Sequence, residues 1–133
     1  MEDKRTPARD DLVDCLNFDP HDILKNLRNK NTNMIIFGHL NINHIVNKFE
    51  SLVYLIKGRV DIMLCSEIKT DSSFPQGQFR IEGYSPPFRK DRDRNGGGLL
   101  LYVREDIPSK EVMVKLPIDV ECLFIEVRIQ SKK

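Results

Sequence analysis

Hydrophobic residues define three elements that follow one another closely in the first half of the chain. Residues 34–40 form a continuous apolar run, the pattern of a strand that is buried on both faces of a sheet, and residues 60–65 are predicted to form a second strand. Between them, four apolar residues recur at helical spacing and form a single stripe: Phe49, Leu52, Val53 and Ile56. This order predicts a βαβ unit with two parallel strands and a helix over 45–57.

The second half of the chain is predicted to consist of strands joined by loops. Residues 98–104 form a long apolar strand, whereas 111–116 and 121–129 alternate apolar and polar residues, as half-exposed antiparallel strands do. Residues 79–84 suit a short strand, and the charged stretch 88–95 suits a loop. We expect an α/β (α+β) fold in which one mixed sheet, with the helix on one face, contains the strands 34–40, 60–65, 98–104 and 121–129.

The first part of the chain, residues 1–33, is expected to be a polar lead-in to a domain over 34–133. Asp19 followed by Pro20 marks the start of a short helix, which we expect to be a linker outside the fold. The N-terminus lacks the apolar segment of a secretory signal, and no run reaches the ~18 apolar residues of a membrane span. We therefore expect an intracellular protein with no membrane contact.

Charge and cysteine content exclude several kinds of protein. The 133 residues include 21 basic and 20 acidic ones, a net charge of +1, which gives no global electrostatic attraction to nucleic acid. Any contact with DNA must therefore come from a local patch. The three cysteines, Cys15, Cys65 and Cys122, contain no C-x-x-C pair, which favours free thiols over a zinc site or a disulfide framework.

Polar side chains follow the two apolar strands of the βαβ unit. Asn41 and Asn43 close the first strand, and Glu67 closes the second. Because the carboxyl ends of parallel strands meet at one edge of a sheet, we expect these side chains to come together. A carboxylate beside an amide suits Mg²⁺ and a phosphate. From the residues alone, a plainer interpretation stays open, in which strands simply end in polar residues and Asn-x-Asn stabilises a turn.

The same residues resemble the opening of the endonuclease/exonuclease/phosphatase superfamily, in the form found in non-long-terminal-repeat retrotransposons. That family opens with a strand ending in L-N-x-N, continues to S-E-T or Q-E-T, and later has a glycine-led strand. This chain has L-N-I-N at 40–43, S-E-I at 66–68 and G-G-G-L-L-L-Y-V-R at 96–104. The resemblance covers roughly 34–129 and corresponds to the first half of the family's domain.

The resemblance implies a four-layer α/β/β/α sandwich, of which the chain encodes the first sheet and its covering helix. It also implies Mg²⁺-dependent nicking of DNA in the nucleus, with Glu67 as the metal ligand and Asn41 at the metal and phosphate edge. Asn43 is a lesser neighbour and a candidate contact to nucleic acid. Because the second sheet of a sandwich covers the first, we expect the uncovered face to favour self-association.

The charged loop before the glycine run is a further candidate contact to nucleic acid. Its basic residues could approach DNA phosphates, although we favour a solvated loop whose charges screen one another: Arg89, Lys90, Arg92 and Arg94. The glycine run lacks both the Gly-Lys-Ser/Thr ending of a P-loop and a following helix. A tight turn into the next strand explains these glycines better.

Several features of the family are absent from the printed sequence. Ile68 replaces the usual Thr, and His44 and Val46 stand where Ser and Arg are usual. No D-x-N motif follows the glycine run. The terminal S-D-H does not occur either, so neither His39 nor His44 inherits the family's catalytic histidine role. We expect the N-terminal fragment of an endonuclease domain that is inactive alone, because such sites act as a unit. A non-catalytic module that binds nucleic acid or protein, or a gene remnant without function, are the alternatives.

Overall fold

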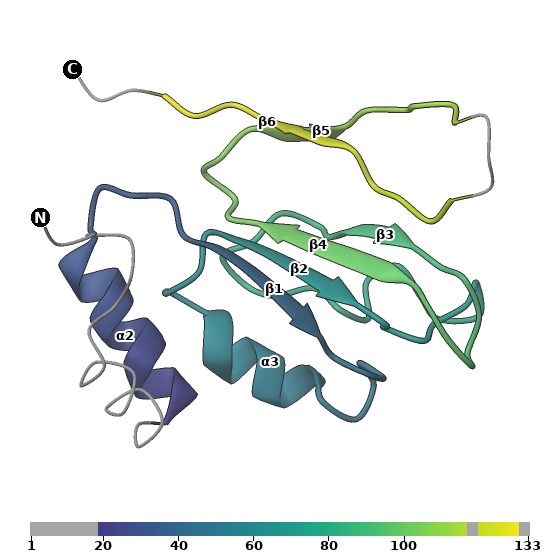
Figure 1. Cartoon of the computed structure of the whole chain (residues 1–133), viewed down its shortest axis with the longest axis horizontal. Helices are drawn as coiled ribbons and strands as arrows, with labels where there is room; N and C mark the ends of the chain where they lie inside the picture. Colours follow the sequence, from purple (N-terminus) through teal and green to yellow (C-terminus); the bar gives the residue numbers. More distant parts are fainter. Residues whose placement is uncertain (1–18, 117–119, 131–133) are drawn as a thin grey trace, which may run out of the picture.

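The computed structural model describes residues 19–116 and 120–130. Within these residues lie two helices, a four-stranded sheet and a two-stranded sheet, which is an α+β fold (Figure 1). The helices and strands, in chain order, are α2 (Pro20–Lys30), β1 (Phe37–Asn41), α3 (Phe49–Ile56), β2 (Ile62–Ser66), β3 (Phe88–Lys90), β4 (Leu99–Val103), β5 (Ser109–Glu111) and β6 (Ile125–Val127).

The larger sheet is mixed and has the strand order β1-β2-β4-β3. Strands β1 and β2 are parallel, whereas β4 runs antiparallel to both β2 and β3. The predicted βαβ unit is confirmed, and α3 lies against one face of this sheet (Figure 1). The carboxyl ends of β1 and β2 therefore lie at the same edge, which is the edge that matters for the candidate site.

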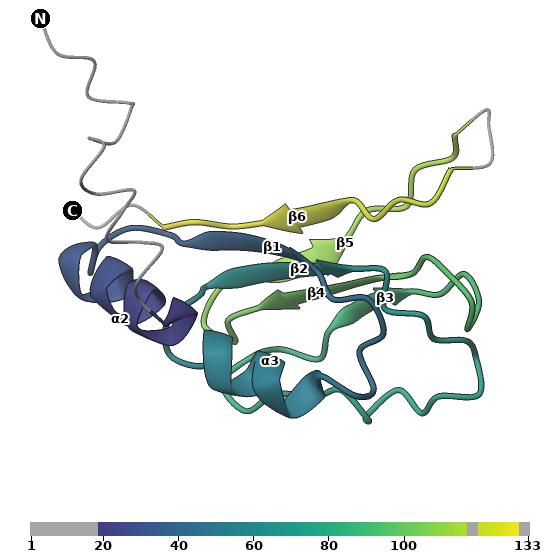
Figure 2. The ribbon, with the colours of Figure 1, turned by 60° about the horizontal axis from the view of Figure 1, so that its bottom comes forward.

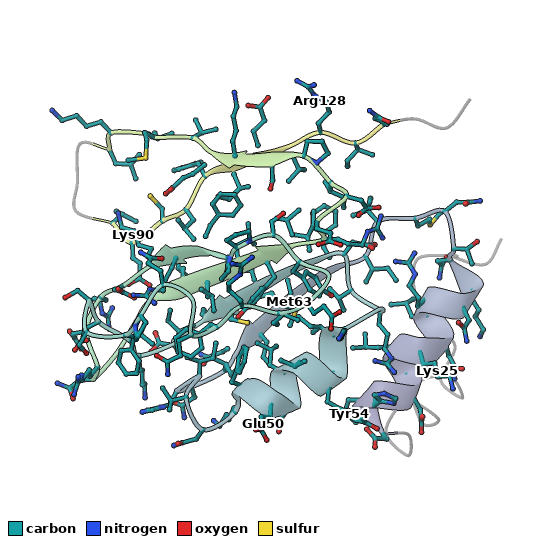
Figure 3. The ribbon with its side chains drawn as sticks, turned by 180° about the vertical axis from the view of Figure 1, so that it is seen from behind. Lys25, Glu50, Tyr54, Met63, Lys90 and Arg128 are labelled. Carbon is teal, nitrogen blue, oxygen red and sulfur yellow. The ribbon has the colours of Figure 1, made fainter. Side chains whose placement is uncertain are left out.

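The main hydrophobic core lies between this sheet and α3. Leu52 and Ile56 of the helix face Met63 and Cys65 of β2, and all four side chains are almost fully buried. Met63 lies between the strands and the helix in Figure 3. Buried Tyr102 adds a hydrogen bond to this core, in which its hydroxyl donates to the Phe79 carbonyl at 2.6 Å. The apolar stripe of the helix thus packs on one face of the sheet, where buried residues of the 79–84 segment join the same core.

The last predicted strand does not join the large sheet. Residues 121–129 contribute β6, which pairs with β5 in a separate sheet on the side opposite α3 (Figures 1 and 2). Val127 packs against Ile62 and Val103, on the face that α3 leaves uncovered. Alternation predicts a half-exposed strand but not its partner, so the sequence pattern alone could not assign this strand to a sheet.

Other predicted boundaries also change. The predicted strand 111–116 is displaced, because β5 ends at Glu111, and the predicted strand 79–84 is a series of turns whose bridge joins Tyr84 to Arg104. The predicted loop 88–95 contains a strand instead, because β3 pairs with β4 over Phe88–Lys90. Three residues are too few for periodicity to reveal a strand.

Helix α2 packs on the domain and is not a linker outside the fold. It begins as predicted, with the Asp19 side chain accepting from the His21 amide at 2.9 Å and Pro20 in the first turn. His21 stacks on Tyr54 of α3 with ring centroids 4.3 Å apart. Arg28 binds the buried Asp61 at 2.7 Å, ahead of β2. The part of the lead-in before residue 19 lies outside the described residues.

Neither described helix is long and apolar enough to cross a membrane.

Candidate metal and phosphate site at the sheet edge

The strand register brings Asn41 and Glu67 to a common edge. Asn41 is the last residue of β1 and lies opposite Ser66, which directly precedes Glu67. The ladder continues beyond the strands, because the Ile42 amide donates to the Ser66 carbonyl at 3.0 Å. Asn41 is exposed and Glu67 is half-buried. The common edge that the βαβ pattern predicts is therefore present in the fold.

Unusual backbone conformations are concentrated at this edge. Among the described residues, the non-glycine residues with positive φ all lie just after β1 or β2: Asn43 (φ 46°), His44 (84°), Glu67 (55°) and Lys69 (58°). Such conformations are uncommon outside glycine and persist only where surrounding contacts fix them. Here the two loops fix each other, since the His44 amide donates to the Glu67 carbonyl at 2.9 Å. The edge is thus a strained but well-bonded pair of loops.

The glycine run holds the Glu67 side chain. The Gly97 amide donates to Glu67 Oε2 at 3.0 Å. Gly97 has a φ of 72°, which strains any larger residue, and an added Cβ would also displace the ends of the Arg92 and Glu121 side chains. The glycines therefore serve the predicted tight turn and also bring a backbone donor to the candidate carboxylate.

Glu121 is a neighbour of this site that the sequence pattern did not reveal. Both of its carboxylate oxygens accept from the Gly98 amide at 3.0 Å. It lies ahead of β6, and no motif singles it out in a segment that reads as an alternating strand. A single acidic residue at the start of such a segment carries no signal that could have found it.

Two lysines converge on Asn43, and sequence analysis missed both. Lys48 Nζ donates to the carbonyls of Ile42 and Asn43, each at 2.8 Å, and Lys69 Nζ donates to Asn43 Oδ1 at 2.6 Å. These contacts stabilise the loop after β1 and place two ammonium groups at the edge. They also occupy the Asn43 side-chain oxygen, so this residue has a structural role in the loop.

The basic residues of the 89–94 stretch differ in their surroundings. Arg89 has only 8% of its side chain exposed and donates to the Phe74 carbonyl at 2.8 Å and to Asp91. Arg94 pairs with Asp71 at 2.6 Å. Both arginines therefore tie this stretch to the 71–75 loop.

Arg92 and Lys90 remain as candidate contacts to a nucleic acid. Arg92 Nε donates to the Gly96 carbonyl at 3.2 Å, which places its guanidinium beside the glycine turn and near the edge. Lys90 is exposed at the margin of the sheet (Figure 3). A DNA contact through either residue stays a prediction.

Two histidines near the edge make no catalytic constellation. His39 Nε2 lies 3.0 Å from Ser66 Oγ on an exposed part of the sheet, while Nδ1 of His44 is buried without a hydrogen-bond partner in the described structure. A nucleophile and base need a third group that orients the base, and no such bond to His39 occurs among the described residues.

The donors at the edge suit a hard cation in kind but are few. The amide oxygen of Asn41 and the carboxylate of Glu67 are the types of ligand that Mg²⁺ takes, and the Gly97 bond uses one of the two Glu67 oxygens. Within residues 19–116 and 120–130, no three or more His, Cys, Asp or Glu side chains gather closely enough to hold a metal ion. A cation here would keep several water ligands.

Neither a scan against models of protein families nor a search of the curated proteins found a match for this chain. The resemblance to the endonuclease superfamily therefore rests on the motifs at 40–43, 66–68 and 96–104.

Proposed function

We propose that this chain carries the N-terminal part of a Mg²⁺-dependent endonuclease domain of the retrotransposon type, whose substrate is the DNA phosphodiester. The observation that carries the proposal is the register that sets Asn41 opposite Ser66, the residue before Glu67, at the carboxyl edge of two parallel strands. Open α/β sheets bind ligands at this edge. The strained backbone at Glu67, with a φ of 55°, adds support, because such strain is common at functional sites.

The residues of the edge have separable roles in this proposal. Glu67 would hold the cation through its carboxylate, and Asn41 would hold the cation or a phosphate oxygen through its amide. When bound, Mg²⁺ would supply the positive charge that stabilises the phosphate and the leaving oxygen. Lys48 and Lys69 would fix the loop that carries Asn43. The printed chain offers no D-x-N motif after the glycine run and no S-D-H motif, so we propose that it does not cleave DNA alone.

A cation-binding experiment tests the proposed site directly. In ¹⁵N-labelled protein, Mn²⁺ should broaden the amide signals of residues 41–43 and 66–68 and leave those of β5 unchanged. Glu67→Gln should abolish most of this effect, because it removes the charged ligand but keeps its size. The matched control is Glu126→Gln, an exposed carboxylate of β6. Broadening that is absent from this edge, or equal in Glu67→Gln, would contradict the proposed site.

A nicking assay tests the proposed lack of activity. With supercoiled plasmid and Mg²⁺, the chain should give no more nicked product than buffer with Mg²⁺. General base catalysis contributes ~10²–10⁴-fold and preorganised charge stabilisation ~10²–10³-fold, and the motifs for both are missing. Nicking by purified protein that disappears in Glu67→Ala would show that a partner chain or another carboxylate completes the site.

A non-catalytic binding module is the second candidate. The observation that favours it is that groups of the protein itself already donate to the acceptors at this edge. Lys69 Nζ donates to Asn43 Oδ1, and the Gly97 amide donates to Glu67 Oε2. Binding of DNA without any Mn²⁺ effect at Glu67 would support this candidate over the endonuclease.

A further inference from the structure

Two carboxylates that are far apart in the sequence accept hydrogen bonds from neighbouring amides of one turn. The Gly97 amide donates to Glu67, and the Gly98 amide donates to Glu121, each at 3.0 Å. Glu67 directly follows β2 of the large sheet, whereas Glu121 belongs to the segment that leads into β6 of the small sheet (Figure 1). The turn before β4 is therefore bonded both to the residue that follows β2 of the large sheet and to the segment that precedes β6 of the small sheet.

These bonds fix the peptide group between Gly97 and Gly98 at its two ends. Its carbonyl oxygen accepts from the Lys69 amide at 3.0 Å, and its N–H donates to Glu121. In a trans peptide the two groups point in opposite directions, so both bonds together define the orientation of the plane. The flanking glycines have φ of 72° and 93° and resist rotation little by themselves. Without Glu121, this peptide would be held at its carbonyl end only.

Glu67 depends on this turn through both its side chain and its backbone. The Gly97 amide holds the carboxylate. The bond from the Lys69 amide to the Gly97 carbonyl holds the 67–69 segment, in which Glu67 and Lys69 both have positive φ. A rotation of the peptide would break that backbone bond and release a conformation that a glutamate rarely adopts.

We propose that Glu121 is a positioning residue: through the Gly97–Gly98 peptide it fixes the backbone of residues 67–69, and with that backbone the Glu67 carboxylate. This role of Glu121 rests on the proposed function in one respect, because Glu67 is taken as a cation ligand. Residues that orient a metal ligand without touching the metal commonly change its affinity 10–100-fold when they are replaced. The small sheet then contributes to the site of the large sheet, and the sequence pattern gives no sign of this.

Two near-isosteric variants of the full chain separate positioning from direct binding. Glu121→Gln keeps the length and an oxygen acceptor for the Gly98 amide but loses the charge. Glu121→Asp keeps the charge but shortens the side chain by one methylene, so the acceptor is withdrawn from Gly98. Glu126→Gln serves as the control, because Glu126 pairs with Lys110 in the small sheet. The readouts are hydrogen exchange of the Gly97 and Gly98 amides without metal, and the Mn²⁺ affinity at Glu67.

The positioning role predicts that Glu121→Asp speeds exchange of both amides and weakens Mn²⁺ binding about tenfold. Glu121→Gln and Glu126→Gln should stay within about threefold of the original chain in both readouts. The proposal is overturned if Glu121→Asp leaves the exchange of both amides unchanged. It is also overturned if Glu121→Gln weakens Mn²⁺ binding and Glu121→Asp does not, because the Glu121 carboxylate would then be a direct ligand. If the unmodified chain shows no Mn²⁺ effect, the proposed function fails, while the exchange data still decide the role of Glu121.

Discussion

Arg28 and Asp61 connect helix α2 to the start of β2 through an ion pair of 2.7 Å in which the Asp61 side chain is only 2% exposed. The same carboxylate also accepts from Arg104 and from the Ile36 amide, the latter at 2.7 Å. A buried carboxylate with three donors anchors the helix, the approach to β1 and the end of β4 at one point. This relationship decides how the first described helix joins the domain.

Replacement of Asp61 by Asn should lower the free energy of unfolding by about 3–5 kcal/mol, because it leaves two arginines without their buried counter-charge. Urea unfolding followed by circular dichroism measures this loss. Glu82→Gln is the control, since Glu82 forms an exposed pair with Lys57 and its replacement should have no measurable effect. Equal stability of the two variants would mean that α2 is not anchored through Asp61.

Gly98→Ala should destabilise the protein more than Gly83→Ala. Both glycines have positive φ, 93° and 91°, which costs an alanine about 1–2 kcal/mol. Only at Gly98 would the added Cβ also clash, because it would lie 2.6 Å from Ile68 Cγ1 in the core, for a further cost of about 1–3 kcal/mol. Thermal melting of both variants checks the order, and an equal loss would show that the turn relaxes away from Ile68.

Much of the large sheet could be predicted because its central strands β2 and β4 are largely buried, whereas β1 is exposed on one face although its apolar run predicted burial on both. The apolar runs around β1 and β2 and the stripe on α3 leave little choice of secondary structure, and parallel pairing then brings Asn41 and Glu67 to one edge. The small sheet could not be assigned in this way. Its strands alternate in polarity, and alternation is compatible with any partner that buries one face.

The remaining residues of the candidate site were not predictable from local pattern. Lys48, Lys69 and Glu121 reach the edge through loop geometry, in which positive φ at Glu67 and at Gly97 turns the chain. Such conformations depend on contacts between segments distant in sequence, so propensity and periodicity carry no information about them. For the basic stretch 89–94, the charge can be predicted from the sequence but the surroundings cannot. The sequence does not show that the Arg89 side chain is buried and donates to the Phe74 carbonyl.

Stability should fall as the pH rises above about 9. Burial raises the pKa of the Cys65 thiol from 9.0 to about 12, and burial followed by the nearby Asp61 charge raises the pKa of Tyr84 from 10.0 to about 12. The unfolded chain loses these protons first, so the folded state binds more protons between pH 9 and 12. The associated stability is fully present below the unfolded pKa values and is lost through this window.

Urea unfolding at a series of pH values measures the effect. Each group should contribute a slope of up to about 1.4 kcal/mol per pH unit within its window. Cys65→Ala should remove the contribution that begins near pH 9 and keep the one from Tyr84. A stability that stays constant up to pH 11.5 would show that neither group remains protonated in the folded state.

Self-association should occur through the side of the large sheet that α3 does not cover. The small sheet covers only part of this side, where Val127 contacts Ile62 and Val103. Phe37 remains 65% exposed, and it lies on β1, which forms one edge of the sheet. Strand β1 contains neither proline nor a lysine, arginine or acidic residue, so it has none of the usual protection of an edge strand.

Sedimentation velocity over a range of protein concentrations should therefore show dimers or larger species, and a hydrophobic dye should bind. Phe37→Lys should reduce both, because a charge on an edge strand opposes pairing with another chain. Met113→Lys is the control, since Met113 is 85% exposed but belongs to neither sheet. If Met113→Lys disperses the protein and Phe37→Lys does not, the contact lies in the segment after β5 and the large sheet is not the interface. A monodisperse monomer that melts cooperatively and binds no dye would contradict self-association altogether, and the small sheet would then suffice to cover the apolar face.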